Sequence, residues 1–215
     1  MKRRAVAVIG VMAGLVVISV LGVGFSSATF HAQSANPTNT FTAATSFCSG
    51  TTTQTVTADR DTYVDQNSPN STAGASTSLI VNSKSNKNER VLVGFTLPSK
   101  PVGCSVTSAT LKLTATSSDS GRTLQAFQVG PAETWTEAGA TWNNQPASTG
   151  TAATTTSGSG LRQWTVTSQV QAMYGSSNPN NGFLVRDQTE SANATQTFSS
   201  REASTNKPQL SITFG

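Results

Sequence analysis

Apolar residues occur along this chain in short segments, and within most of these segments every second residue is apolar. The run Ala109, Leu111, Leu113 and Ala115 is the clearest case. Such alternation turns one face of a strand toward a core and the other toward water. Clusters of Gly, Asn, Ser and Pro separate these segments, as turn residues separate strands. The pattern predicts strands within residues 54–58, 79–81, 91–95, 109–115, 124–129, 163–166, 183–185, 195–198 and 210–214.

About nine or ten strands without long helical stretches predict an all-β protein, a single β-sandwich that is jelly-roll-like. Residues 147–160 are almost entirely Ser, Thr, Ala and Gly, and we expect them to form a low-complexity loop. One short helix is predicted where Thr167 caps a turn that contains Val170 and Met173 and that Gly175 ends.

The chain is predicted to divide into three parts. Residues 1–28 look like a signal peptide, with Lys2, Arg3 and Arg4 before an apolar stretch and small residues at its end. A membrane anchor is the alternative, because about 20 apolar residues can cross a bilayer. Residues 29–52 are predicted to be a flexible tether, and residues 53–215 a β-sandwich domain. We therefore expect a secreted, extracellular domain. Association with the cell surface is the alternative location.

Charge argues against nucleic acid as a partner. The chain has 14 basic and 10 acidic residues, but three of the basic ones lie in the expected leader, which leaves 14 − 3 = 11 against 10. A domain this close to neutral lacks the dense basic stripe of a nucleic-acid-binding surface. We also expect no membrane contact once the leader is cleaved.

Cys48 and Cys104 are the two cysteines of the chain. In an exported protein, two cysteines most simply form one disulfide. The alternatives are a metal site and a Cys–His nucleophile. The metal site lacks further ligands and the Cys–His nucleophile lacks its base, because the sole histidine, His31, lies near the leader. The same lack of histidine disfavours a Ser-His-Asp triad, although a glycosidase would need only two carboxylates.

Several phrases occur in a recognisable order: Asp61-Thr-Tyr-Val64, Arg90-Val-Leu-Val-Gly-Phe95, Glu133-Thr-Trp-Thr-Glu137, Asn181-Gly-Phe-Leu-Val185 and Ser200-Arg-Glu202. In this order they resemble the DNRLRE domain family, which is grouped with carbohydrate-binding module family 96. The resemblance covers about residues 53–215. It implies a non-catalytic module, not an enzyme, with no catalytic residues. The segment 28–43 also resembles the leaders of camelysin-like and TasA-like surface proteins.

Candidate carbohydrate-binding residues gather in one segment, where Trp135 and Trp142 are followed by Asn143 and Asn144. An indole can stack on the apolar face of a sugar ring while amides bond its hydroxyls. The alternative is that each Trp plugs the end of the core, which is also what we expect of Trp164. Arg186 is a further candidate, because a guanidinium suits the carboxylates of acidic polysaccharides.

We expect no cofactor, and a structural calcium ion is the one possibility that the sequence keeps open. Asp59, Asp61 and Asp65 lie close in sequence, beside Asn67 and Asn70, and oxygen ligands of this kind suit Ca²⁺. A solvated face with turn-forming Asp is the alternative. For Arg201 we expect a structural role, in which it bonds a buried Asp or backbone carbonyls.

Two functions remain open. The first is a secreted, non-catalytic module that recognises an extracellular or cell-wall polysaccharide. The second is a structural subunit of a cell-surface or extracellular matrix filament, which would self-associate by donating an extended N-terminal segment to a neighbour. Phe30, Phe41 and Phe47 in the predicted tether are compatible with that second role.

Overall fold

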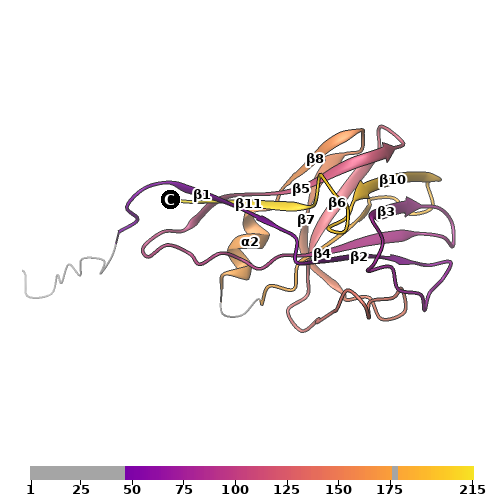
Figure 1. The fold of residues 1–215 in the computed structure, drawn as a ribbon, viewed down its shortest axis with the longest axis horizontal. Coiled ribbons are helices and arrows are strands. Elements are labelled where there is room, and N and C mark those ends of the chain that lie inside the picture. Colours follow the sequence, from indigo (N-terminus) through magenta and orange to yellow (C-terminus); the bar gives the residue numbers. More distant parts are fainter. Residues whose placement is uncertain (1–46, 176–178) are drawn as a thin grey trace, which may run out of the picture. The chain divides into compact units, whose positions relative to one another are not determined.

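The computed structural model describes residues 47–175 and 179–215, and the regular secondary structure of this part of the chain is almost wholly β-strand. The expected all-β class is confirmed (Figure 1). The elements are β1 (Thr52–Thr57), β2 (Arg60–Asp65), β3 (Ser78–Ser83), β4 (Glu89–Gly94), β5 (Val106–Ser118), β6 (Thr123–Val129), β7 (Ser148–Thr156), β8 (Gly160–Thr165), α2 (Thr167–Met173), β9 (Phe183–Asp187), β10 (Ala194–Ser199) and β11 (Gln209–Phe214).

One antiparallel sheet of eleven strands curls on itself to form the sandwich. Its first half has the order β1-β11-β5-β10-β3, with β8 on the other side of β5. Its second half consists of β2, β4, β9, β6 and β7. A single residue pair, Asn82 with Glu89, joins the two halves through β3 and β4. The halves therefore act as two layers that enclose a core.

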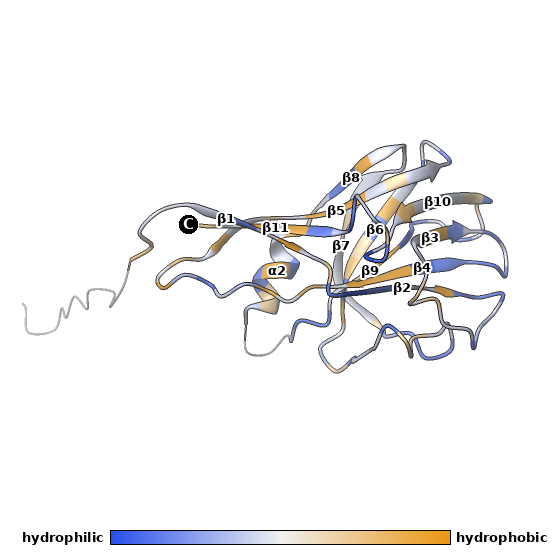
Figure 2. Cartoon of the chain, in the orientation of Figure 1, coloured by the Kyte–Doolittle hydropathy of each residue, from blue (hydrophilic) through white to orange (hydrophobic). Residues whose placement is uncertain are grey.

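The main core lies between these layers, and the predicted alternation accounts for it. Along β5 the side chains of Ala109, Leu111, Leu113 and Ala115 are buried, while those between them face outward. Figure 2 shows the same change between apolar and polar residues along the strands. Trp164 is fully buried among them, and its indole N–H donates to the Leu124 carbonyl at 3.1 Å. The expected core role of Trp164 is confirmed.

A second, smaller core lies on the outward face of the second layer. The segment of residues 130–147, between β6 and β7, folds across this face and covers it. Strand β4 is consequently buried on both sides, which its unbroken run Val91-Leu-Val93 reflects. The buried members of this small core are Val64, Leu92, Val129, Trp135, Ala140 and Leu184, with Trp142 packed against them.

Two local predictions are wrong. The segment expected to be a loop at 147–160 contains the strand β7, which pairs with β6. The helix exists, but Thr167 does not cap it. Val166 stands at the cap position, and the Thr167 hydroxyl instead accepts a hydrogen bond from the Ala109 N–H at 3.0 Å. No helix in the ranges that the structure describes is long and apolar enough to cross a membrane.

The predicted disulfide between Cys48 and Cys104 is confirmed, and no described cysteine is free. It links the chain just before β1 to the loop before β5, and both strands flank β11. The bond therefore closes one end of the first layer. The expected signal peptide at 1–28 and most of the expected tether lie outside the described residues.

Removal of the disulfide should destabilise the fold without changing its class. We expect the Cys48→Ser, Cys104→Ser double variant to lose about 3–4 kcal/mol of unfolding free energy, because the bond closes a loop with a sequence separation of 56 residues. Chemical denaturation measures this loss. The unreduced, denatured wild-type protein should show no reactive thiol, and two thiols per chain would contradict the pairing.

Candidate functional site

Trp135 anchors the 130–147 segment to the sheet. Its indole is 9% exposed, and the indole N–H donates to the Asn181 carbonyl at 2.8 Å. The guanidinium of Arg60 lies over the ring, 5.0 Å from the ring centre. Trp135 is therefore a buried part of the small core, as expected under the alternative to sugar stacking. It does not present an open face on which a sugar could stack.

Trp142 is half-buried and lies nearer the surface. The guanidinium of Arg90 lies 4.5 Å from the centre of its ring. Arg90 is itself fixed by two hydrogen bonds to the Glu190 carboxylate, at 2.7 and 2.8 Å, and by one to the Gln145 side chain at 3.0 Å. Because Arg90 is held from several sides, Trp142 rests on a rigid support.

Asn143 and Asn144 are exposed, yet both help to shape the segment. The Asn143 side-chain amide donates to the Asn70 side chain at 2.8 Å, which ties the segment to the loop after β2. The side-chain oxygen of Asn144 accepts from the Thr141 N–H at 2.6 Å, and its amide donates to the Gly139 carbonyl at 2.9 Å. The Asn144 side chain therefore uses its hydrogen bonds in the turn, while Asn143 follows Trp142 at the surface.

Arg186 lies on β9, on the same outward face as Arg90. Leu92 pairs with Leu184 in the register of β4 and β9, and Arg90 and Arg186 each lie two residues from these two small-core leucines. The Arg186 guanidinium lies over the ring of Phe127 on β6, 5.0 Å from its centre. We call this surface the arginine–aromatic face and define it by Arg90, Gln125, Phe127, Trp142 and Arg186.

Two polar atoms on the arginine–aromatic face have no hydrogen-bond partner among the described residues. They are Nε of Arg186 and Oε1 of Gln125, and both are buried from solvent. The two residues are directly paired across β9 and β6. An unpaired donor beside an unpaired acceptor is unusual in a folded protein, since most buried polar atoms are bonded to protein or to water.

A separate group of acidic side chains lies at the other side of the 130–147 segment. Asp61, Glu137 and Glu202 each place a carboxylate oxygen within 4.8 Å of the others. Arg201 binds all three, because one nitrogen of its guanidinium donates to Glu137 and Glu202, both at 2.8 Å, and its backbone N–H donates to Asp61 at 2.7 Å. We call these three carboxylates the acidic cluster. The expected structural role of Arg201 is confirmed, although glutamates are its side-chain partners.

The aspartates considered for calcium do not come together. Asp59 binds Arg60 and the Thr96 hydroxyl, and Asp65 accepts from the N–H of Asn67 within its own turn. Asp61 alone enters the acidic cluster. Sequence reasoning missed Glu137 and Glu202 as its partners, although both stand in phrases that carry the family resemblance.

Burial raises the pKa of Asp61 to about 7. The N–H of Arg201 opposes this by lowering the pKa, while the nearby charges of Glu202 and Glu137 raise it further. The pKa of Arg201 is also raised, mainly by its hydrogen bond to Glu137. The cluster thus holds more negative charge than its single guanidinium balances.

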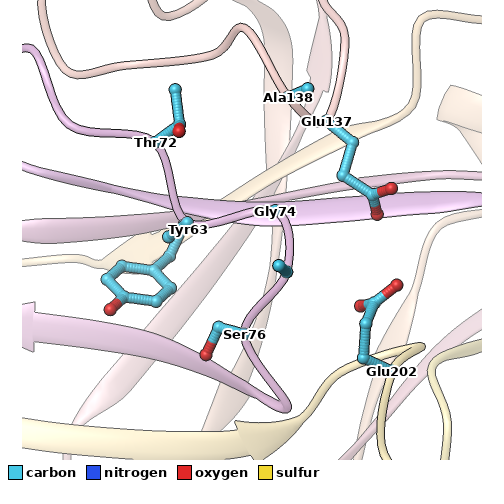
Figure 3. Close-up of a pocket in the computed structure, with 9 residues that line it drawn as sticks. Tyr63, Thr72, Gly74, Ser76, Glu137, Ala138 and Glu202 are labelled. Carbon is cyan, nitrogen blue, oxygen red and sulfur yellow. The ribbon is translucent and has the colours of Figure 1, made fainter.

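An open pocket of about 690 Å³ lies beside the acidic cluster. Figure 3 shows the carboxylates of Glu137 and Glu202 pointing toward one another at its edge, with Tyr63 and the 72–76 segment on the other side. Gly74 lies so close to the Glu137 carbonyl that a Cβ at this position would overlap it. Asp61 is 1% exposed and does not line the pocket.

Aromatic and arginine side chains, which form the arginine–aromatic face, are enriched at binding interfaces. Residues 52–214 match carbohydrate-binding module family 96, and the chain belongs to this family. None of the curated proteins compared with the chain matches it. The family supports the expected carbohydrate partner. The resemblance to DNRLRE domains and the camelysin-like or TasA-like leader stay predictions.

The two tryptophans of the 130–147 segment should differ in their effect on stability. Trp135→Ala should lower the free energy of unfolding by about 3–5 kcal/mol, because it empties the small core. Trp142→Ala should cost only about 1–2 kcal/mol, because it removes one partly exposed ring and its arginine contact. Urea denaturation of both variants measures the difference, and equal losses would contradict these placements.

The raised pKa of Asp61 predicts a dependence of stability on pH. The folded-state pKa of about 7 exceeds the ordinary value of 3.8, so the folded state binds more protons between these two values. The contribution of Asp61 to stability is therefore full below about pH 4 and is lost as the pH rises through about 7. Denaturation from pH 4 to pH 8 in a chelator, compared with Asp61→Asn, isolates this effect. A wild-type curve parallel to that of the variant would contradict it.

Proposed function

We propose that this chain is a non-catalytic module that binds a polysaccharide outside the cell, and that the arginine–aromatic face is the contact surface. Membership of carbohydrate-binding module family 96 supports the class of ligand. The expected leader and the disulfide support the location, because disulfides persist in oxidising compartments. Trp142, Asn143 and Arg186 retain their predicted roles in this proposal. Trp135 and Asn144 would act by shaping the segment that carries them.

The half-exposed guanidinium of Arg186 carries this proposal. Its Nε and the Oε1 of its strand neighbour Gln125 are buried, so the outer nitrogens of the guanidinium are the donors that a ligand could reach. Sugar hydroxyls and carboxylates are groups that accept hydrogen bonds from such donors. Because Phe127 supports the guanidinium from one side, the donor is held in position before a ligand arrives.

The chemistry of the face favours an acidic polysaccharide. Arginine binds carboxylates through two parallel hydrogen bonds, a geometry that lysine does not offer. Arg90 covers one face of the Trp142 ring, and the opposite face could stack on a sugar ring. Asn143 would add an amide next to that ring.

The acidic cluster does not favour hydrolysis. A general acid has to reach the glycosidic oxygen, but Asp61 is buried and does not line the pocket. Glu137 and Glu202 are both held in ion pairs with Arg201. These contacts support a binding module without catalytic residues.

The binding test begins with a glycan array and continues by calorimetric titration of the polysaccharide that binds. Arg186→Gln should weaken binding about tenfold or more, because it removes a charged hydrogen-bond donor. Trp142→Ala should weaken it by roughly five- to thirtyfold through the loss of one stacked ring. The matched control is Arg162→Gln, on β8 in the first layer, which should bind as the wild type does.

Equal affinity of wild type and Arg186→Gln, with both melting alike, would show that the sugar binds elsewhere. Loss of binding in the Arg162→Gln control would place the contact on the first layer.

The alternative of a filament subunit stays a prediction. Its proposed donor segment lies mostly outside the described residues, where Phe30 and Phe41 fall. Phe47, the third aromatic of that segment, is 77% exposed in the structure. Sedimentation of the purified protein over a range of concentrations would detect self-association of this kind.

A further inference from the structure

We propose that the acidic cluster of Asp61, Glu137 and Glu202 is a binding site for a divalent cation with the chemistry of Ca²⁺. The site lies at the edge of the open pocket and is distinct from the arginine–aromatic face. It also differs from the set of neighbouring aspartates that the sequence suggested, because its ligands come from three distant segments of the chain.

The balance of charge is the first reason. Three carboxylates meet one guanidinium, that of Arg201, which leaves a surplus of two negative charges when all are ionised. Asp61 is 1% exposed, so water screens little of this surplus. A single divalent cation would neutralise it.

An unused ligand atom is the second reason. Oδ1 of Asp61 is buried and has no hydrogen-bond partner among the described residues, whereas Oδ2 accepts from the Arg201 N–H. Buried polar atoms without partners often mark a place where water or an ion is bound. Oδ1 is therefore the atom that most requires a ligand.

The geometry suits calcium. Ca²⁺ binds oxygen at about 2.3–2.6 Å, so oxygens that share one ion lie no more than about 5 Å apart. One oxygen from each of the three carboxylates already falls within 4.8 Å of the others. Each carboxylate oxygen has two lone pairs, so those that accept a hydrogen bond can still coordinate.

The pocket provides access and further ligands. Glu137 and Glu202 line it, and their carboxylates face one another there (Figure 3). Water in the pocket could complete the coordination of the ion, as it commonly does for calcium. The ion would tie β2 to the 130–147 segment and to the turn after β10.

The test uses the purified full-length protein after treatment with a chelator. Adding about 5 mM Ca²⁺ should raise the melting midpoint by about 3–6 °C, if the affinity is that of extracellular calcium modules. Calorimetric titration of Ca²⁺ should show one site per chain. Equal ionic strength from NaCl should give no shift, and Mg²⁺ a smaller one.

Three variants locate the site. Glu202→Gln, Glu137→Gln and Asp61→Asn should each weaken Ca²⁺ binding at least tenfold. The control is Glu133→Gln, the same chemical change in the same segment, which should bind Ca²⁺ as the wild type does. If the three variants fold poorly, terbium luminescence of the wild type replaces them, because Tyr63 lines the pocket and can sensitise the ion. Added Ca²⁺ should then quench that luminescence.

Absence of both a melting shift and binding heat would overturn the proposal and leave a proton as the occupant of the cluster. Binding that survives in all three variants would also overturn it, since the ion would then lie elsewhere. Either result is distinguishable from failure of the proposed polysaccharide site, because Arg186→Gln leaves the acidic cluster intact.

Discussion

The packing of the 130–147 segment across the second layer is the constraint on which both candidate sites depend. A sheet layer that is apolar on both faces has to be covered on both, and here the core covers one and this segment the other. Trp135 fixes the segment by its buried ring and its bond to Asn181. From that anchor the chain carries Glu137 to one side and Trp142 to the other. One packing interaction therefore organises two chemically different sites.

The two sites differ in chemistry: one presents arginine and aromatic side chains, and the other presents carboxylates. On the arginine–aromatic face, guanidinium groups lie over aromatic rings. In the acidic cluster, Arg201 gathers carboxylates from segments more than sixty residues apart in sequence, as its pairing with Glu137 shows. A cation there would strengthen the same segment that supports Trp142. Binding of an ion and binding of a sugar would then be linked through the stability of one loop.

Much of the fold could be predicted from the sequence, because strands with one buried face show a period of two in hydropathy. β5 and β11 are such strands, and the disulfide followed from the presence of only two cysteines. β7 was missed because none of its side chains is fully buried, so the sequence carries no hydropathy signal for it. The cap at Thr167 was wrong because a tertiary contact with Ala109 claims its hydroxyl.

The candidate sites were less predictable, for physical reasons. The tryptophans and amides of the 130–147 segment identified it as a candidate binding segment, but the sequence did not show which of its two indoles is buried. That choice depends on Arg60 and Asn181, which come from distant strands and loops. The acidic cluster joins Asp61, Glu137 and Glu202 only after the sheet has folded. Local spacing pointed instead to the aspartates that are neighbours in sequence.

Native-state hydrogen exchange tests most directly whether the 130–147 segment is ordered by its packing on the sheet. The amide of Asp61 donates to Glu137, that of Ala140 to Thr136, and that of Asn143 to Pro69. We predict that these three amides exchange slowly in the wild-type protein and that Trp135→Ala speeds all of them together, while the amides of β5 remain protected. Rapid exchange of the three in the wild type, or their continued protection in Trp135→Ala, would contradict the organising role of this packing.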